Sequence, residues 1–247
     1  MRTRTYTESI THVTPLDAVA LASASPRRRE LLASLGLRVT VIPSAYDELP
    51  LPGVHPVEIA LRHARGKAAA ATPSGELIVA ADTVVDVDGE ALGKPGDPTE
   101  ARSMLRRLSG RWHVVHTAFA LRDDRTAASL SEVVSTRVRF ADLDDETVQA
   151  YAASGDGLDK AGAYGIQGFA ATLVERIDGD YFTVVGFPLA AFARALPRIG
   201  KILIPPEMVM DRAQQHRKNT DQLVARSERG PHAERGGRAA WGGAPSK

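Results

Sequence analysis

The chain has 247 residues and a formal net charge of +1, and 43% of its residues are hydrophobic. This composition is typical of a globular protein that is long enough to bury a substantial core. The absence of cysteine excludes disulfides and thiolate metal sites, and the small net charge argues against strong binding to nucleic acid. The absence of cysteine makes a reducing cytoplasm the expected location. The N-terminus lacks an apolar leader and no apolar window is long enough to span a membrane, so we expect neither a secretory signal nor a membrane span.

The N-terminal part alternates short strand patterns with helix patterns. We expect residues 1–17 to form a flexible extension. The segment "DAVALAS" predicts a buried strand, and a helix should follow with Ser25 as N-cap, Pro26 in its first position and Gly36 just past its end. "LRVTVIPS" alternates like a strand.

A second helix is predicted by "HPVEIALRHARGKAAAA". Its apolar stripe is expected to consist of Val57, Leu61, Ala64 and Ala68. The following run "LIVAADTVVDVDGEAL" predicts a long strand that turns back at Asp88-Gly89.

A third helix is predicted to begin after Asp97 and to end at Gly110. Its buried stripe is expected to consist of Met104, Leu105 and Leu108. "WHVVHTAFAL" and "VVSTRVRF" then predict two strands.

The C-terminal part begins with a helix predicted from Asp144 to about Ala153. The glycine-rich loop "GDGLDKAGAYGIQGFA" follows, then a hairpin predicted to turn at Asp178-Gly179, and "FPLAAFARALPRI" predicts the last core helix. Strands and helices do not alternate strictly, which predicts one α/β domain over residues 18–205 with a mixed twisted sheet and flanking helices. Residues 206–247 are polar and rich in Arg and Gly, and we expect a disordered tail.

Three consecutive arginines occupy the first turn of the helix that follows Ser25. Each cation there costs about 0.3–1 kcal/mol at low salt, because the helix N-terminus already carries partial positive charge. A bound anion would reverse that cost, since free N–H groups and guanidinium groups suit phosphate. Arg27, Arg28 and the hydroxyl of Ser23 are therefore candidate phosphate ligands. A solvated basic turn, including Arg29, is the alternative interpretation.

Asp82 and Thr83 interrupt an apolar strand. An ionised carboxylate in such a strand is costly unless it is paired, hydrogen-bonded or bound to metal. Asp82 is thus a candidate metal ligand or general base, and Glu48 could join it on one divalent cation. A structural ion pair, or a strand end that reaches solvent, is the alternative for Asp82.

Two lysines and one glutamine complete the candidate site. Lys67 lies near the edge of the apolar face of its helix, and Lys94 lies between a hairpin and a helix. Considered alone, each is interpreted as an ordinary solvated lysine. Together with Arg27 and Arg28, they would provide the cations that a triphosphate needs. The amide of Gln167, in the glycine-rich loop, could read the edge of a base, although an ordinary flexible loop is the alternative.

Eight segments in order over roughly residues 18–195 resemble the Maf family of nucleoside triphosphate pyrophosphatases. They are "LASASPRRRELL", "YDE", "HARGKA", "AADTVV", "LGKP", "LSGRWHVVHTAFAL", "DKAGAYGIQG" and "GDYFTVVGFPL". The resemblance implies a fold related to the inosine-triphosphatase class, with two lobes around a cleft and often a homodimer. It also implies hydrolysis of a nucleoside triphosphate to the monophosphate and diphosphate with a divalent cation, Mg²⁺ or Mn²⁺.

The resemblance also implies roles for individual residues. Asp82 matches the family's proton acceptor. Arg27, Thr83 and Gln167 match positions associated with substrate choice, and the other matched pocket positions are Ser23, Arg28, Glu48, Lys67 and Lys94.

The "ADT" and "GIQG" segments look like the subgroup that acts on dTTP and UTP. A 7-methyl-GTP or broad-range pyrophosphatase is the alternative enzyme. A regulatory protein linked to septum formation and cell-division arrest is the alternative of another class.

Overall fold

The computed structural model describes residues 13–204. The strands are β1 Thr14–Leu16, β2 Ala18–Leu21, β3 Arg38–Val41, β4 Leu77–Val87, β5 Glu90–Leu92, β6 Trp112–Asp123, β7 Ala128–Phe140, β8 Val174–Asp178 and β9 Lys201–Leu203. The α-helices are α1 Pro26–Ser34, α2 Pro56–Ala70, α3 Pro98–Leu108, α4 Asp145–Ser154, α5 Tyr181–Val185 and α6 Leu189–Ala195. Short 3₁₀ helices are η1 Ala161–Ala163, η2 Gly168–Leu173 and η3 Leu196–Ile199.

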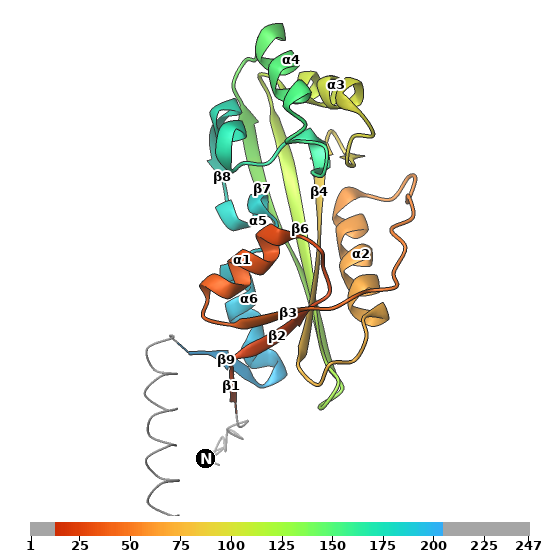
Figure 1. Cartoon of the computed structure of the whole chain (residues 1–247), viewed down its shortest axis with the longest axis vertical. Coiled ribbons are helices and arrows are strands. Elements are labelled where there is room, and N and C mark those ends of the chain that lie inside the picture. The colour runs from red at the N-terminus through yellow and green to blue at the C-terminus, as the bar shows by residue number, and fades with distance from the viewer. Residues whose placement is uncertain (1–12, 205–247) are drawn as a thin grey trace, which may run out of the picture. The chain divides into compact units, whose positions relative to one another are not determined.

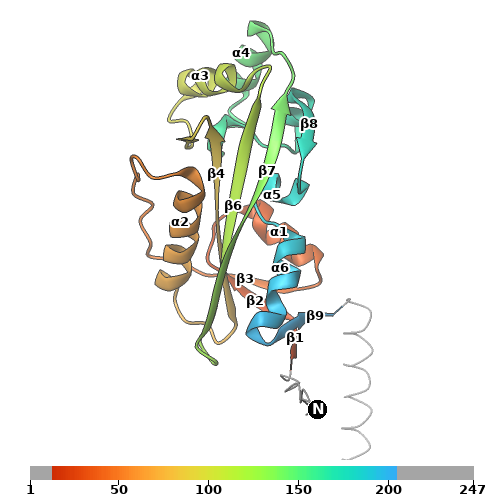
Figure 2. The same ribbon diagram turned by 180° about the vertical axis from the view of Figure 1, so that it is seen from behind.

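A mixed seven-stranded sheet forms the centre of the fold. Its strand order is β3-β2-β4-β6-β7-β8, with β5 paired to β4. The pairs β2–β3 and β2–β4 are parallel, whereas β4, β6, β7 and β8 pair antiparallel. In the two opposite views, α2 covers one face of the long strands and α1 and α6 cover the other (Figures 1 and 2). The predicted mixed α/β sheet with flanking helices is confirmed.

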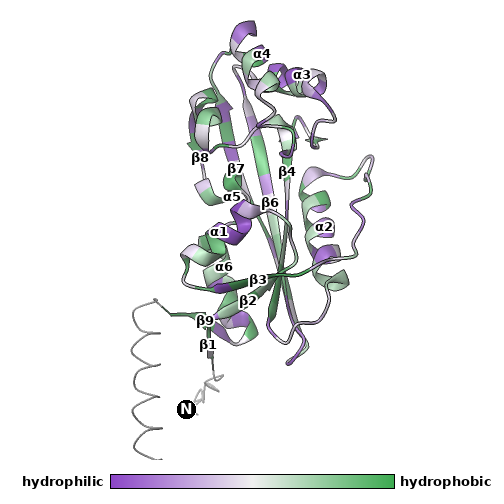
Figure 3. Ribbon diagram, in the orientation of Figure 1, coloured by the Kyte–Doolittle hydropathy of each residue, from purple (hydrophilic) through white to green (hydrophobic). Residues whose placement is uncertain are grey.

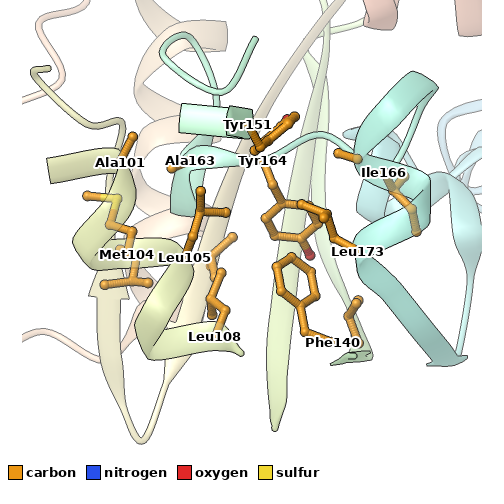
Figure 4. Close-up of a cluster of buried hydrophobic side chains, with 14 of the residues drawn as sticks. Ala101, Met104, Leu105, Leu108, Phe140, Tyr151, Ala163, Tyr164, Ile166 and Leu173 are labelled. Carbon is orange, nitrogen blue, oxygen red and sulfur yellow. The ribbon is translucent and has the colours of Figure 1, made fainter. Parts of the chain in front are cut away.

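The buried side chains form separate clusters at the two ends of the long strands, which gives the fold two lobes. One cluster packs α3, α4 and the glycine-rich segment against the sheet, with Met104, Leu105, Phe140 and Tyr164 among its members (Figure 4). The other end has a cluster on each face of the sheet, one with α1 and α6 and one with α2. Colouring by hydropathy shows the start of α1 as a hydrophilic segment beside the apolar strands (Figure 3). The long strands β4, β6 and β7 run through both lobes.

Several local signals in the sequence are confirmed. The helix α1 begins after Ser25 with Pro26 in its first turn, and Gly36 follows it with a φ of +80°. The β4–β5 hairpin turns at Asp88-Gly89, where both residues have positive φ. At α3, the Asp97 carboxylate accepts from the first-turn backbone N–H groups, as an N-cap should.

The inward face of α2 differs from the predicted stripe. Ala64 and Ala68 are buried as expected, but Val57 and Leu61 are only half-buried. The buried positions instead include Ile59, Ala60, His63 and Lys67. His63 and Lys67 are polar, and each has a partner inside the fold. A search for periodic apolar residues cannot identify such positions as buried.

The hairpin predicted at Asp178-Gly179 is wrong. The chain leaves β8 and enters the short helix α5, because the Asp180 carboxylate accepts from both the backbone N–H and the hydroxyl of Thr183. Gly179 has a φ of +131°, and a Cβ there would lie 2.8 Å from Thr136 Oγ1. The glycine therefore serves a close approach to β7 and not a hairpin turn.

Strand β1 lies within the segment expected to be a flexible extension. It pairs in parallel with β9, which the sequence did not predict, and Lys201 on β9 lies 3.0 Å from the buried Asp123 carboxylate on β6. The remainder of the extension and the predicted tail, residues 1–12 and 205–247, lie outside the described residues. Over residues 13–204, no helix has the length and apolarity needed to cross a membrane.

Candidate active site

All of the site residues predicted from sequence line one cleft of about 2060 Å³. They are Ser23, Arg27, Arg28, Glu48, Lys67, Asp82, Thr83, Lys94 and Gln167. They come from both lobes: α1, α2 and the segment after β3 belong to one, and the β5–α3 and glycine-rich segments belong to the other. The predicted cleft between two lobes is confirmed.

The register of the sheet explains why Asp82 and Thr83 interrupt an apolar strand. Strand β2 accompanies β4 only as far as Val79, and β5 begins to pair with β4 only at Val85. The other edge of β4 pairs with β6 throughout this stretch. Asp82 and Thr83 therefore lie on a short open edge, where polar side chains meet the cleft.

A buried cation joins two carboxylates at this edge. Lys67 Nζ, from α2, lies 2.7 Å from Asp82 Oδ1 and 2.8 Å from Glu48 Oε1. Lys67 and Asp82 are 9% and 6% exposed, so both charges have left bulk water. Removing one partner of such a buried pair typically costs about 3–5 kcal/mol, because the other charge is left uncompensated.

Glu48 is held in its ionised form by these surroundings. Burial opposes ionisation, but the hydrogen bond from Lys67 and the nearby positive charges of Lys67 and Lys94 outweigh it. The pKa of Glu48 therefore lies below its ordinary value.

The Arg28 guanidinium makes three hydrogen bonds to oxygens of the protein itself. Its Nε donates to the Gly186 carbonyl at 3.0 Å, Nη1 to Ser23 Oγ at 3.0 Å and Nη2 to Thr83 Oγ1 at 3.1 Å. Burial lowers the pKa of Arg28, and the negative charges of Asp82 and Glu48 oppose that shift. The guanidinium is thus fixed in the cleft wall, and only its remaining N–H groups can face a ligand.

Thr83 is held on two sides. Besides accepting from Arg28, its Oγ1 lies 2.9 Å from Thr117 Oγ1 on β6, and Thr117 donates to the Thr183 carbonyl. The threonine therefore fixes the orientation of Arg28 and leaves its hydroxyl little freedom.

The three arginines of α1 have different surroundings. Arg29 is exposed and lies outside the cleft lining, as expected for a solvated neighbour. Arg27 is half-buried, and its Nη1 lies 3.5 Å from Asp159 Oδ2 in the glycine-rich segment. Arg27 thus connects α1 to the other lobe.

Lys94 and Gln167 are exposed members of the lining. Lys94 follows β5, and its charge contributes to the low pKa of Glu48. Gln167 is the N-cap residue of η2, but its side chain caps no backbone N–H. Its amide therefore remains available to a ligand in the cleft.

Sequence reasoning missed several lining residues, although they lie inside the quoted segments. The Tyr46 hydroxyl is 3.0 Å from His63 Nδ1, and the Tyr46 ring packs on Gly66, where a Cβ would lie 2.1 Å from Cε2. A glycine within a helical pattern was the signal for this close approach. Asp159 and Lys160 also line the cleft, two positions whose partners a local pattern cannot show.

A divalent cation fits this donor set only if a bound phosphate supplies additional oxygen ligands. Among residues 13–204, no group of three or more His, Asp or Glu side chains is arranged to hold a metal. Glu48 and Asp82 nevertheless lie close together, since both contact the same Lys67 nitrogen, and the second oxygen of each carboxylate, Oε2 and Oδ2, is not used in that contact. Mg²⁺ commonly binds one or two carboxylates together with substrate phosphates, and Mn²⁺ also suits oxygen donors. The two carboxylates match that pattern.

Comparison with known proteins gives the family. Residues 18–199 match the family model described as "Maf-like protein". A dTTP/UTP pyrophosphatase of Geobacter sulfurreducens is 50% identical over 74% of this chain and 97% of that protein. A dTTP/UTP pyrophosphatase of Thermus thermophilus is 51% identical over 69% of this chain and 88% of that protein. The chain therefore belongs to the Maf family.

Proposed function

We propose that the protein is a nucleoside triphosphate pyrophosphatase that favours dTTP and UTP and releases the nucleoside monophosphate and diphosphate. The observation that carries this proposal is the cleft in which Lys67 holds Asp82 and Glu48 beside the basic start of α1. The relatives named dTTP/UTP pyrophosphatase, at 50% and 51% identity, support the reaction and the substrate class.

The triphosphate binds along the basic wall of the cleft. Arg27, the free N–H groups of Arg28 and the start of α1 offer donors and positive charge to phosphate oxygens. Lys94 approaches from the other lobe. These cations stabilise the charge that develops on the departing diphosphate.

Asp82 acts as the general base. Its carboxylate takes a proton from the water that attacks the α-phosphorus, and the bond from that phosphorus to the bridging oxygen breaks as the diphosphate leaves. Lys67 orients the carboxylate through the 2.7 Å contact. A divalent cation at Glu48 and Asp82, Mg²⁺ or Mn²⁺, would neutralise charge on the phosphate oxygens.

Gln167 and Thr83 determine substrate choice in different ways. The Gln167 amide, exposed at the edge of the cleft, contacts the base. Thr83 acts mainly by fixing Arg28, because its hydroxyl is already engaged by Arg28 and Thr117. The homodimer implied by the resemblance and the cytoplasmic location expected from the composition stay predictions.

A substrate panel tests the proposal. Diphosphate release is measured from dTTP, UTP, GTP and 7-methyl-GTP with the full chain, with Mg²⁺ or Mn²⁺ and with EDTA. We expect release from dTTP and UTP that EDTA abolishes. Preferred release from 7-methyl-GTP would overturn the substrate class, and no release from any triphosphate would overturn the enzymatic function.

A further inference from the structure

Lys160 is a half-buried cation of the glycine-rich segment, and the proposed reaction assigns it no role. Its side chain is 14% exposed, although it lines the cleft. Nζ lies 2.8 Å from Asp159 Oδ1 and 3.3 Å from Asp156 Oδ1, and it also donates to the Asp156 carbonyl. A lysine with this many partners is held in one orientation and holds its neighbours in turn.

The aliphatic part of Lys160 supports the backbone that leads to Gln167. A Cβ at Gly165 would lie 2.7 Å from both Cδ and Cε of Lys160. The chain therefore passes directly over the lysine stem two residues before Gln167. We therefore expect a change in the position of Lys160 to move the backbone that leads to Gln167.

The same segment is anchored to α4 through a tyrosine. The hydroxyl of Tyr151, a buried residue of α4, donates to Asp156 Oδ2 at 2.7 Å. Its ring stacks on Phe169, with centroids 6.1 Å apart and planes at 16°. Burial and the Asp156 carboxylate raise the pKa of Tyr151, so the phenol keeps the proton that it donates. Asp156 and Phe169, before and after Gln167, are thus fixed to one side chain.

Asp159 links this segment to the opposite wall of the cleft. One of its carboxylate oxygens contacts Lys160, and the other lies 3.5 Å from Arg27 Nη1. These contacts run from Arg27 through Asp159 and Lys160 to Asp156. They therefore join the basic start of α1 to the glycine-rich segment that carries Gln167.

We propose that Lys160 is a positioning residue that fixes residues 156–168 so that Gln167 meets the nucleobase, with Asp159 connecting this segment to Arg27. The proposal rests on the proposed function and deepens it. It separates two properties of the cleft: discrimination between bases depends on Lys160, whereas the attack on phosphorus uses groups on β4 and α2.

The test is Lys160→Met, which keeps the stem over Gly165 and removes the ammonium group. We expect the ratio of kcat/KM for dTTP to that for GTP to fall about tenfold, the effect of losing one charge-assisted hydrogen bond. Amide exchange of residues 161–168 should become faster in the same variant. The matched control is Lys201→Met, because Lys201 is 18% exposed and pairs with Asp123 on β6 outside the cleft lining. It should keep the wild-type ratio.

Asp159→Asn provides a second variant in case Lys160→Met does not fold. It leaves the contacts of Lys160 with Asp156 in place and weakens the link to Arg27, so we expect a smaller fall in the same ratio. An unchanged dTTP/GTP ratio, or an unchanged exchange rate in residues 161–168, would overturn the proposal. If the wild-type chain releases no diphosphate from any triphosphate, the proposed function fails. In that case, the rate of amide hydrogen exchange in residues 161–168 of the two variants is the measurement that shows whether Lys160 orders the segment.

Discussion

The ammonium group of Lys67 lies 2.7 Å from the Asp82 carboxylate, and this contact joins helix α2 to the open edge of β4. Neither residue could be buried alone without a large desolvation cost. Together they place an oriented carboxylate in the cleft. The same nitrogen also contacts Glu48, so one lysine organises both candidate cation ligands.

Asp82→Asn should lower turnover by about 10²–10⁴-fold while nucleotide binding persists. An amide keeps the shape of the side chain but cannot accept the proton of the attacking water, and removal of a general base typically costs about 10²–10⁴-fold in rate. Diphosphate release gives the turnover, and calorimetric titration with dTTP gives the affinity. The matched control is Asp86→Asn on the same strand, since Asp86 binds His116 and the Gly89 N–H and does not line the cleft. Near-normal turnover in Asp82→Asn would contradict the assignment.

Arg28→Met and Arg29→Met should differ strongly despite their adjacency. The first removes the guanidinium that donates to Ser23, Thr83 and the Gly186 carbonyl, so we expect a loss of about 1–3 kcal/mol in stability together with most of the activity. The second removes an exposed charge and should stay within about 0.5 kcal/mol of the wild type. Urea unfolding and diphosphate release measure both quantities. Equal losses would show that the first turn of α1 is oriented differently.

Gln167→Glu should change the order of preference among dTTP, UTP and GTP. The substitution replaces an amide donor with a carboxylate, which repels the carbonyl oxygens of a pyrimidine. Loss of such a hydrogen bond shifts kcat/KM by about tenfold or more. Gln149→Glu makes the same chemical change on the exposed surface of α4 and should leave the order intact. If both variants change the order of preference in the same way, Gln167 does not read the base.

Local chemistry accounts for most of what could be predicted from the sequence. The proline at the start of α1 and the Asp88-Gly89 turn act over a few residues, and such signals can be read directly, although the Ser25 side chain itself makes no capping hydrogen bond. Asp82 was recognisable because a charge inside an apolar strand needs a partner. The identity of that partner was not recognisable, since Lys67 faces inward only because the fold brings α2 onto β4.

The elements that were missed depend on distant partners. Strand β9 has only three residues, and its pairing with β1 and the Lys201–Asp123 contact connect segments far apart in the chain. The Arg27–Asp159 contact is of the same kind. Each segment alone carries too little periodicity or propensity to predict the element or the contact.

His113 should make the protein less stable as the pH falls. Its imidazole is 2% exposed, and burial together with the nearby charge of Arg111 lowers its pKa from 6.5 to about 4. Between those values the unfolded chain binds a proton that the folded chain does not, so stability is lost as the pH falls through this window, by about 3 kcal/mol in total. Below the folded pKa this contribution changes no further.

The variant His113→Gln isolates that effect from the titration of other groups. Glutamine can still reach the Tyr164 hydroxyl, which lies 2.7 Å from Nε2 in the wild type, but it does not titrate. Urea unfolding of both proteins at several pH values between about 7 and 4 should show the wild type losing stability relative to the variant. A difference that stays constant with pH would mean that His113 has the same pKa in the folded and unfolded states.

Gly66→Ala should destabilise the protein, although alanine in a helix interior is ordinarily better than glycine by about 1 kcal/mol. The new methyl group would lie 2.1 Å from Cε2 of Tyr46, whose hydroxyl is tethered to His63. The ring must move, and with it the segment that carries Glu48 towards Lys67, so diphosphate release should fall as well.

The decisive measurement repeats Gly66→Ala in a Tyr46→Ala background and compares thermal unfolding of the four proteins. With the ring removed, the substitution should become stabilising, because only the helix preference of alanine remains. The same sign in both backgrounds would show that Tyr46 does not require the glycine.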